Sequence, residues 1–340
     1  MNSTLPPIVE ARDLTVDFAA GRGMIRAVRG VDLSLKPAET LALLGESGSG
    51  KSVTLRALMR LHPKSAKIGG TIQVDDADVL ALAPSALRAY RGKTVSMIFQ
   101  DPSLAFDPVY RIGDQIAETV MRHEGASRAE GRKRALELFE RVRIPSPERR
   151  LDNFPHEMSG GMRQRAMIAL ALACRPKVLL ADEPTTALDA TVQIQVLLLL
   201  RELQREFGLA IVFVTHDIGV AVEIADRIAV MYAGCIVESG TCRDVIRNPS
   251  HPYTRGLLSS RAHGTLGKDE RLKAIPGSPP DLSAPPPGCA FGPRCEHFID
   301  SCAADIPPNV PVDSLHSARC FRIGSSPPPH PRRARHGSNA

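Results

Sequence analysis

The stretch LALLGESGSGKS, residues 41–52, joins a short apolar run to a glycine-rich loop that ends in Lys51 and Ser52. The apolar residues predict a buried strand, and the residues after the loop predict a helix. The loop itself fits the phosphate-binding pattern GxxxxGK[ST], in which glycines let backbone N–H groups turn toward phosphates at a helix N-terminus. A glycine-rich turn that binds nothing is disfavoured, because both flanking elements are the expected ones. The expected nucleotide-binding residues are Gly45, Glu46, Ser47, Gly48, Ser49, Gly50, Lys51 and Ser52.

Two carboxylates end a second apolar run, VLLADE at residues 178–183. A parallel strand delivers its last residues to the carboxyl edge of the sheet, where a phosphate-binding loop also lies. Asp182 and Ser52 are therefore expected to hold Mg²⁺, while Lys51 reaches the β and γ phosphates. Glu183 is placed to polarise the water that attacks the nucleotide. A pair of solvated carboxylates is the alternative, and the neighbouring phosphate loop disfavours it.

The order of apolar runs indicates an α/β fold with a mostly parallel sheet and helices on its faces. Strands and turns are expected in the first 40 residues, and mainly helices from about 103 to 175. Further on, strands over 178–181 and 210–215 flank a helix over 191–207.

The C-terminal part of the chain has a different composition. Half of the 28 prolines and four of the seven cysteines lie after residue 274. We expect this segment not to continue the α/β core, and residues 326–340 to form a disordered basic tail. An odd number of cysteines in a reducing compartment argues against a disulfide framework.

Composition also restricts partners and location. The absence of Trp and an aromatic content of 4% leave little surface for base stacking, so no nucleic-acid partner is expected. The net charge of +6 suits a protein near anionic nucleotides or anionic lipid. No apolar run is long enough to span a bilayer, and the N-terminus lacks a secretory signal, so we expect a cytoplasmic protein.

The stretch MSGGMRQR, residues 158–165, predicts a second anion site. Ser159 can cap a helix whose first residues, Gly160 and Gly161, leave backbone N–H groups uncovered. Because the chain already has one phosphate loop, this second site is expected to serve the nucleotide of another chain.

The same stretch resembles the LSGGQ signature of ATP-binding cassette (ABC) ATPases, although Met158 and Met162 replace the usual leucine and glutamine. The resemblance covers about residues 8 to 325. It implies a RecA-like P-loop nucleotide-binding domain at residues 1–260, with an antiparallel β subdomain and a helical subdomain at about 103–175. In this family two cassettes close head to tail, and each signature helix covers the ATP held by the opposite phosphate loop.

Other positions also match the family, which implies ATP and Mg²⁺ as cofactors. Gln100 resembles the Q-loop glutamine that contacts Mg²⁺ and water and senses the transmembrane subunits. Asp189 lies in a D-loop match at the dimer interface, and His216 resembles the switch histidine that contacts the γ phosphate. Phe18 stands where the family places an aromatic ring on adenine. The implied Mg²⁺ ligands are Ser52, Gln100 and Asp182, and the implied catalytic residues are Glu183, His216 and Gln100.

Several stretches resemble the oligopeptide, dipeptide and nickel importers: residues 99–116, 154–165 and 251–260, and most specifically the C-terminal stretches 275–282, 285–302 and 316–320. The resemblance implies an ATP-hydrolysing subunit of a membrane importer for peptides, lying on the cytoplasmic face of the inner membrane as a peripheral protein. Its implied partners are a second ABC ATPase subunit, expected to be a paralogue, two transmembrane permeases and an extracytoplasmic substrate-binding protein. Nickel, glutathione or another small cargo are alternatives to peptides.

Three other kinds of ABC protein are disfavoured. A soluble member acting on DNA would carry a long coiled coil between Lys51 and Ser159, and this chain has no sustained heptads there. A translation factor would carry two cassettes, and an exporter would lack the importer-type C-terminal segment.

Four cysteines mark the C-terminal extension, residues 261–325: Cys289, Cys295, Cys302 and Cys320. Four thiolates on a proline-stiffened loop can bind a metal centre, and the absence of CxxC pairs argues against a zinc ribbon. The importer resemblance implies a [4Fe-4S] cluster with a structural or regulatory role. Zinc, or four reduced structural cysteines without metal, are the alternatives.

Overall fold

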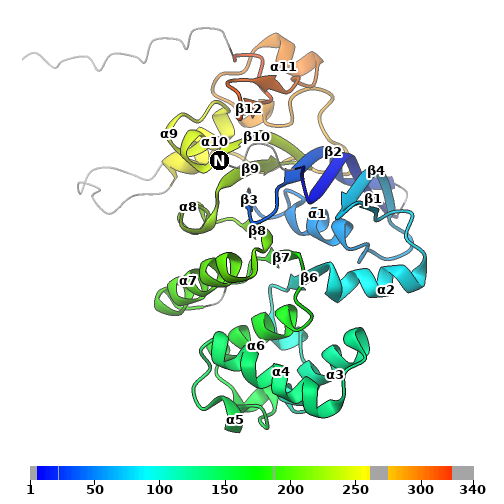
Figure 1. Ribbon diagram of the computed structural model, residues 1–340. Helices are drawn as coiled ribbons and strands as arrows, with labels where there is room; N and C mark the ends of the chain where they lie inside the picture. Colours follow the sequence, from blue (N-terminus) through cyan, green and yellow to red (C-terminus); the bar gives the residue numbers. More distant parts are fainter. Residues whose placement is uncertain (1–5, 22, 187, 261–274, 324–340) are drawn as a thin grey trace, which may run out of the picture.

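The computed structural model describes residues 6–21, 23–186, 188–260 and 275–323. Figure 1 shows a central sheet region, a group of helices at one end, and the C-terminal extension at the other. The basic tail expected over residues 326–340 lies outside the described residues.

The main sheet has the strand order β11-β12-β10-β9-β3-β8-β7-β6 in the described part of the chain. Neighbours from β9 to β6 are parallel, as the alternation of strands and helices predicted. The strands are β3 (Thr40–Leu44), β6 (Val95–Ile98), β7 (Val178–Asp182), β8 (Ala210–Thr215), β9 (Arg227–Tyr232), β10 (Cys235–Thr241), β11 (Val310–Pro311) and β12 (Ser317–Ala318).

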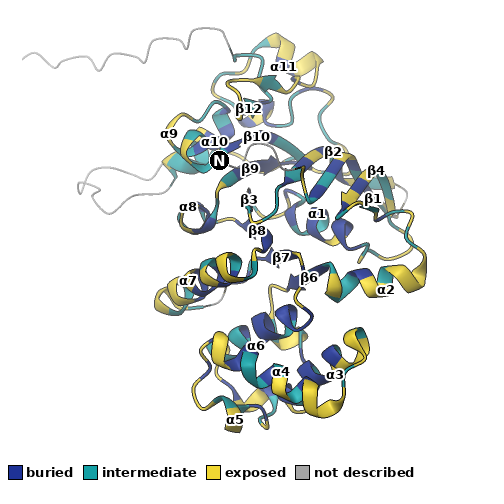
Figure 2. Ribbon diagram, viewed as in Figure 1, coloured by how far each residue is buried: buried dark blue, intermediate teal, exposed yellow. Residues whose placement is uncertain are grey.

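Both faces of this sheet are covered, which explains why its central strands are apolar throughout. Every residue of β3, β7 and β8 is buried. Successive residues of β7 face opposite sides, as a strand requires: Leu179 packs in one core cluster and Leu180 in another. Figure 2 shows the sheet as the most continuously buried part of the molecule.

An antiparallel sheet of order β2-β1-β4-β5 lies beside the main sheet. Its strands are β1 (Val9–Ala20), β2 (Gly23–Leu35), β4 (Lys67–Val74) and β5 (Ala77–Asp78), and the first three share a core cluster with α1 (Lys51–Leu58). The helix α2 (Pro84–Lys93) then leads into β6. The expected strands of the first 40 residues are thus present, and they pack against the helix that follows the phosphate loop.

The helices at one end of the molecule lie between β6 and β7 in the chain (Figure 1). The inner side chains of α3, such as Ile116 and Val120, pack with Leu138 and Phe139 of α4 in one core cluster, while the outer surfaces are exposed (Figure 2). Ser127 and Glu130 form a capping box at the start of α4. These helices are α3 (Ile112–Glu124), α4 (Arg128–Arg141), α5 (Pro147–Arg150) and α6 (Gly160–Leu172), with short 3₁₀ helices at Pro102–Leu104 and Pro155–Glu157.

Two more helices lie beside the main sheet, α7 (Ala190–Phe207) and α8 (Ile218–Ile224). The C-terminal part contributes α9 (Cys242–Arg247), α10 (Pro252–Ser259), a 3₁₀ helix at Gly292–Arg294, and α11 (Asp300–Ala304). Within the described ranges, no helix combines the length and the apolar character that crossing a bilayer requires.

The expectation that the C-terminal segment would not continue the α/β core is wrong. Strand β12 pairs antiparallel with β10, matching Ala318 with Glu238, and β11 pairs with β12. The edge strand β10 presents backbone N–H and C=O groups, and a two-residue extended segment satisfies part of them even in a proline-rich chain. Residues 310–311 and 317–318 of the extension therefore form the outermost strands of the main sheet.

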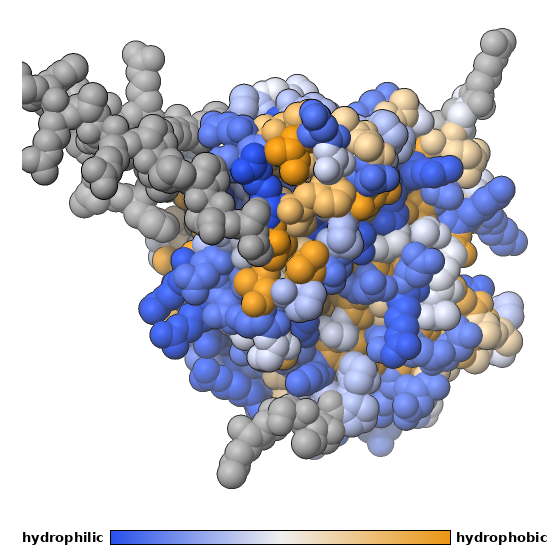
Figure 3. All heavy atoms as spheres, turned by 90° about the horizontal axis from the view of Figure 1, so that it is seen from above, coloured by the Kyte–Doolittle hydropathy of each residue, from blue (hydrophilic) through white to orange (hydrophobic). Residues whose placement is uncertain are grey.

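A buried polar contact strengthens this attachment. His316 Nε2 lies 2.7 Å from Glu238 Oε1, and both side chains are buried. Glu238 also accepts hydrogen bonds from the backbone N–H groups of Ser250 and His251. Figure 3 views the molecule from above and shows hydrophobic residues interrupted by hydrophilic ones on that face. In the extension, Phe298 and Leu315 are among the exposed large apolar side chains.

Candidate nucleotide site

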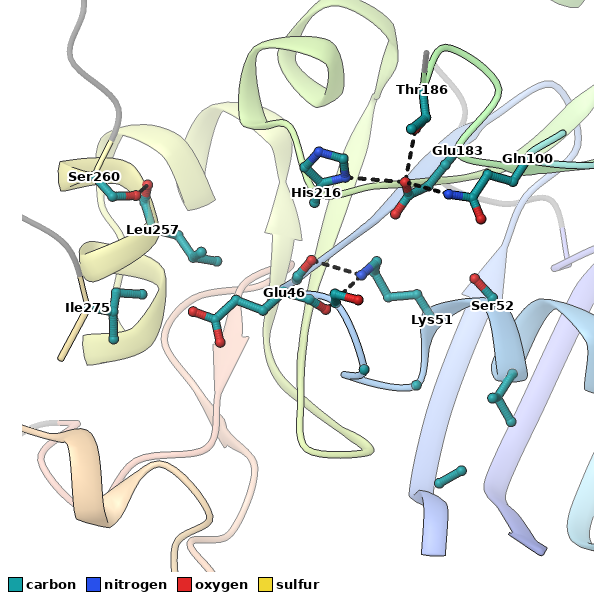
Figure 4. A pocket seen from close by; sticks show the side chains of 16 residues that line it. Glu46, Lys51, Ser52, Gln100, Glu183, Thr186, His216, Leu257, Ser260 and Ile275 are labelled. Carbon is teal, nitrogen blue, oxygen red and sulfur yellow. Dashed lines mark hydrogen bonds and ion pairs between the residues drawn. The ribbon is translucent and has the colours of Figure 1, made fainter. Parts of the chain in front are cut away.

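A cavity of about 820 Å³ opens at the carboxyl end of β3 (Figure 4). The loop after β3 forms one wall, and residues from the ends of β6, β7 and β8 form another. Segments from the C-terminal part close a third side. The lining includes Glu46, Lys51, Ser52, Gln100, Glu183, Thr186, His216, Leu257, Ser260 and Ile275.

The loop between β3 and α1 is shaped by its glycines. Gly48 and Gly50 have φ of 77° and 104°, a left-handed conformation that favours glycine. A Cβ on Gly45 would lie 2.2 Å from the carbonyl oxygen of Met231, so only glycine fits against β9 there. The loop can therefore bring its backbone close to a bound group, as the sequence predicted.

The ammonium of Lys51 lies inside this loop. Its Nζ donates to the carbonyl oxygens of Gly45 and Glu46, both at 2.8 Å. Burial lowers the pKa of Lys51, while the carboxylates of Glu183 and Asp182 act in the opposite direction. A cation on a glycine-rich loop at a helix N-terminus is a strong site for phosphate groups.

The two expected side-chain ligands for Mg²⁺ on the loop and on β7 are in contact. Ser52 Oγ donates to Asp182 Oδ1 at 2.6 Å, and Asp182 is buried. Burial raises the pKa of Asp182, and the bond from Ser52 together with Arg56, at 3.9 Å, partly offsets this effect. A hydroxyl and a carboxylate at this distance form an oxygen donor set that suits Mg²⁺.

Glu183 is held by three neighbours (Figure 4). Its Oε2 accepts from the Thr186 hydroxyl at 2.9 Å and from Gln100 Nε2 at 3.5 Å, and it lies 3.3 Å from His216 Nδ1. The Glu183 backbone has φ of 46°, an unusual value for a residue other than glycine. The turn after β7 thus places the Glu183 carboxylate between the ends of β6 and β8, facing the cavity.

Seven of the predicted nucleotide-binding residues are absent from the lining of this cavity: Phe18, Ser49, Ser159, Gly160, Gly161, Asp182 and Asp189. Ser159 and Gly160 are exposed at the start of α6, and Gly161 is half-buried there. Ser159 Oγ accepts from the N–H of Met162 at 3.3 Å, and a Cβ on Gly160 would meet no atom within 4 Å. The predicted helix start with uncovered N–H groups is present, outside the lining of the chain's own cavity.

Phe18 and Asp189 also lie outside the lining of the cavity. The Phe18 ring packs edge-on against the imidazole of His62, with centroids 5.3 Å apart. Asp189 caps α7 by accepting from the N–H of Val192 at 3.0 Å.

Comparison with known proteins identifies the family. The family model "ABC transporter" matches residues 28–186, and "Oligopeptide/dipeptide transporter, C-terminal region" matches residues 237–302. A putative peptide import ATP-binding protein of Brucella melitensis is 48% identical over 330 residues, covering 93% of this chain and 97% of the relative. This chain belongs to the ABC transporter family.

Other members of the ABC transporter family extend the likeness. The oligopeptide transport ATP-binding protein OppD of Bacillus subtilis is 46% identical over 323 residues, covering 94% of this chain and 90% of OppD. A dimeric structure of the ATP-binding cassette MJ0796 bound to ADP and Pi is 32% identical, with a TM-score of 0.62, covering 69% of this chain and 99% of that chain. The predicted fold class of an ABC nucleotide-binding domain is confirmed.

In this ABC transporter chain, several residues near the loop were not anticipated from the sequence. Tyr253 accepts from the N–H of Glu46 at 2.9 Å through its hydroxyl, and Arg294 contacts the Glu46 carboxylate. Leu257, Ser260 and Ile275 line the cavity. The stretch at 251–260 resembled the importers, but no local pattern indicated that it would reach the phosphate loop.

The iron–sulfur prediction for this ABC transporter chain is not supported by the geometry. Cys289 N–H donates to the carbonyl oxygen of Cys302 at 2.8 Å, so two of the four cysteines are neighbours. Burial raises the pKa of Cys295 to about 11 and raises that of Cys289 and Cys320. Throughout the described ranges, no group of three or more His, Cys, Asp or Glu side chains is arranged to hold a metal ion.

Proposed function

We propose that this chain is the ATP-hydrolysing subunit of a membrane importer for peptides. The observation that carries the proposal is that Lys51, Ser52 and Glu183 line one cavity, where the Ser52 hydroxyl also contacts the Asp182 carboxylate. The C-terminal region matches that of oligopeptide/dipeptide transporters, and the relatives are named for peptide import and oligopeptide transport.

We assign the chain's own nucleotide to the loop from Gly45 to Ser52. Backbone N–H groups and the Lys51 ammonium bind the phosphates, and Ser52, Asp182 and Gln100 supply oxygen atoms for Mg²⁺. When bound, Mg²⁺ neutralises phosphate charge. Glu183 accepts a proton from the attacking water. His216 helps to hold the Glu183 carboxylate in place through the contact of its Nδ1.

The signature residues Ser159, Gly160 and Gly161 are proposed to cover the ATP of a second ABC subunit. Their position outside the chain's own cavity supports this, because an anion site at an exposed helix start needs a ligand from elsewhere. Asp189 is proposed to lie at the same interface, and Phe18 to stack on adenine with some rearrangement of the His62 contact. The second subunit is proposed to be a paralogue.

The remaining partners are proposed from the family. Two transmembrane permeases and an extracytoplasmic substrate-binding protein complete the importer, and the chain is a peripheral protein on the cytoplasmic face of the inner membrane. The working domains are residues 1–260, with a helical subdomain at about 103–175, and an extension at 261–325. Peptides are favoured over nickel or glutathione by the names of the relatives.

Transport in reconstituted vesicles tests the proposal. The chain, its paralogue, both permeases and the substrate-binding protein are combined with ATP and a mixture of labelled di- and oligopeptides, and peptide uptake is compared with the uptake of Ni²⁺ and glutathione. We expect ATP-dependent peptide uptake that Lys51→Ala abolishes. Uptake of Ni²⁺ or glutathione alone would refute the peptide assignment, and absence of ATP hydrolysis would refute the whole proposal.

The [4Fe-4S] cluster remains a hypothesis about Cys289, Cys295, Cys302 and Cys320. It requires the four thiols to lose their protons and to draw closer than in the structure. Iron and acid-labile sulfide are measured on anaerobically purified protein, with Cys302→Ser as the matched variant. Four irons and four sulfides per chain, lost in the variant, would establish the cluster; zinc or no metal would exclude it.

A further inference from the structure

A residue of the C-terminal extension holds the side chain of a phosphate-loop residue. Arg294 Nη1 donates to Glu46 Oε2 at 2.8 Å, and Arg294 Nη2 donates to Glu46 Oε1 at 3.2 Å. This two-pronged geometry is the strong form of an arginine–carboxylate contact. The two residues are 248 positions apart in the chain, so only the folded extension creates the pair.

Arg294 is fixed from every side. Its Nε donates to the carbonyl oxygen of Pro276 at 2.8 Å, and its Nη1 donates to the Tyr232 hydroxyl at 3.2 Å. The guanidinium also lies over the rings of Tyr232 and Phe291, 5.8 and 6.0 Å from their centroids. The hydrogen bonds to Glu46 are the main reason that the pKa of Arg294 is raised.

Burial makes this pair more important than a surface contact. The Arg294 side chain is only 6% exposed, and the Glu46 side chain is 26% exposed. Removing one partner of such a pair leaves the other charge poorly solvated and without compensation. Here the remaining charge would be the carboxylate of Glu46, on the loop to which we assign the triphosphate.

The direction of the Glu46 side chain fits this reasoning. Figure 4 shows its carboxylate pointing away from Lys51, toward the side of the cavity where Ile275 lies. Tyr253 holds the Glu46 backbone at the same time, because the N–H of Glu46 donates to the Tyr253 hydroxyl. The loop is thus held at Glu46 by residues of α10 and of the extension, while its glycines stay free to face the phosphates.

We propose that Arg294 is a positioning residue for ATP binding: it neutralises Glu46 and turns that carboxylate away from the phosphates. The extension is then a working part of the nucleotide site as well as an edge of the sheet. This inference rests on the proposed ATP-binding function of the loop. It predicts an electrostatic effect, which differs from the effect of merely loosening the extension.

A double-mutant cycle on the purified full-length chain tests this, with the dissociation constant of ATP measured by isothermal titration calorimetry in the presence of Mg²⁺. Arg294→Met should weaken ATP binding about tenfold, equivalent to roughly 1.4 kcal/mol. Glu46→Gln alone should tighten binding severalfold, because it leaves the guanidinium unpaired. Adding Glu46→Gln to Arg294→Met should recover most of the lost affinity, and Arg294→Lys should be intermediate.

The matched control is His316→Gln, which weakens another buried attachment of the extension, at Glu238, far along the chain from the loop. It should lower the melting temperature and keep the ATP affinity. The inference is overturned if Glu46→Gln does not restore binding to Arg294→Met, or if His316→Gln weakens ATP binding equally. Should Arg294→Met fail to fold, Arg294→Lys and Glu46→Gln decide the matter by the same signs. If the wild-type chain itself bound no ATP, the proposed function would fail first.

Discussion

Replacing Glu183 with glutamine separates ATP binding from ATP hydrolysis. The amide has nearly the same size as the carboxylate. Its oxygen can still accept from the Thr186 hydroxyl, which lies 2.9 Å from the carboxylate in the wild-type chain. The Glu183→Gln variant therefore keeps the turn after β7 and the shape of the cavity. It loses the negative charge and the ability to take a proton from water.

The expected size of the effect follows from the role of a general base. Such a group contributes about 10²- to 10⁴-fold to a rate, or roughly 2.7 to 5.5 kcal/mol of barrier. Glu183 is well placed for the upper half of this range, because its side chain is only 15% exposed and three side chains orient it. The ATP dissociation constant should stay the same or fall, since a negative charge near the phosphates is removed.

Phosphate release and subunit association are the two measurements. With the paralogue and ATP present, Glu183→Gln should give a stable closed pair by analytical ultracentrifugation and at least about 1,000-fold slower phosphate release. Thr186→Val is the matched control: it removes one bond to Glu183 and keeps the carboxylate, so only a severalfold loss is expected. Hydrolysis at the wild-type rate in Glu183→Gln would refute the assignment of Glu183 as the base.

Three further predictions concern stability and reactivity. Gly45→Ala should lower the free energy of unfolding by more than about 2 kcal/mol, because its Cβ would meet the Met231 carbonyl at 2.2 Å. Gly48→Ala has open space around it and should lower that free energy by only about 1 kcal/mol. Equal losses for the two variants in urea denaturation would contradict the packing argument. Burial lowers the pKa of His251 to about 3, so the folded state stays uncharged while the unfolded chain gains a proton below about pH 6.5. Stability should therefore fall by about 1.4 kcal/mol per pH unit below that point, and His251→Asn should show a flatter profile. Burial also raises the pKa of Cys174 to about 11, so its alkylation should be slow at pH 8 and should rise about tenfold per pH unit; fast labelling at pH 8 would show an accessible thiolate instead.

The candidate nucleotide site was largely predictable because its parts are local. The loop at Gly45–Ser52 and the pair Asp182–Glu183 each lie in one short stretch, and each follows an apolar strand. Parallel pairing then brings both stretches to one edge of the sheet, where Ser52 and Asp182 meet. Secondary structure and the topology of strands and helices were thus enough to place most of this site.

The amino-acid order by itself determined the phosphate loop, the carboxylates after β7 and the helix start at Ser159, because glycine, charge and apolar runs act on their immediate neighbours. Only the tertiary structure decided that the extension would add β12 to the sheet and that Arg294 would reach Glu46. These contacts join residues far apart in the chain, and their residue types carry no local periodicity. The sequence of a proline-rich segment predicts that it forms no long helix or strand. The surface on which it packs depends instead on the unpaired edge of β10 and the open side of the loop at residues 45–52.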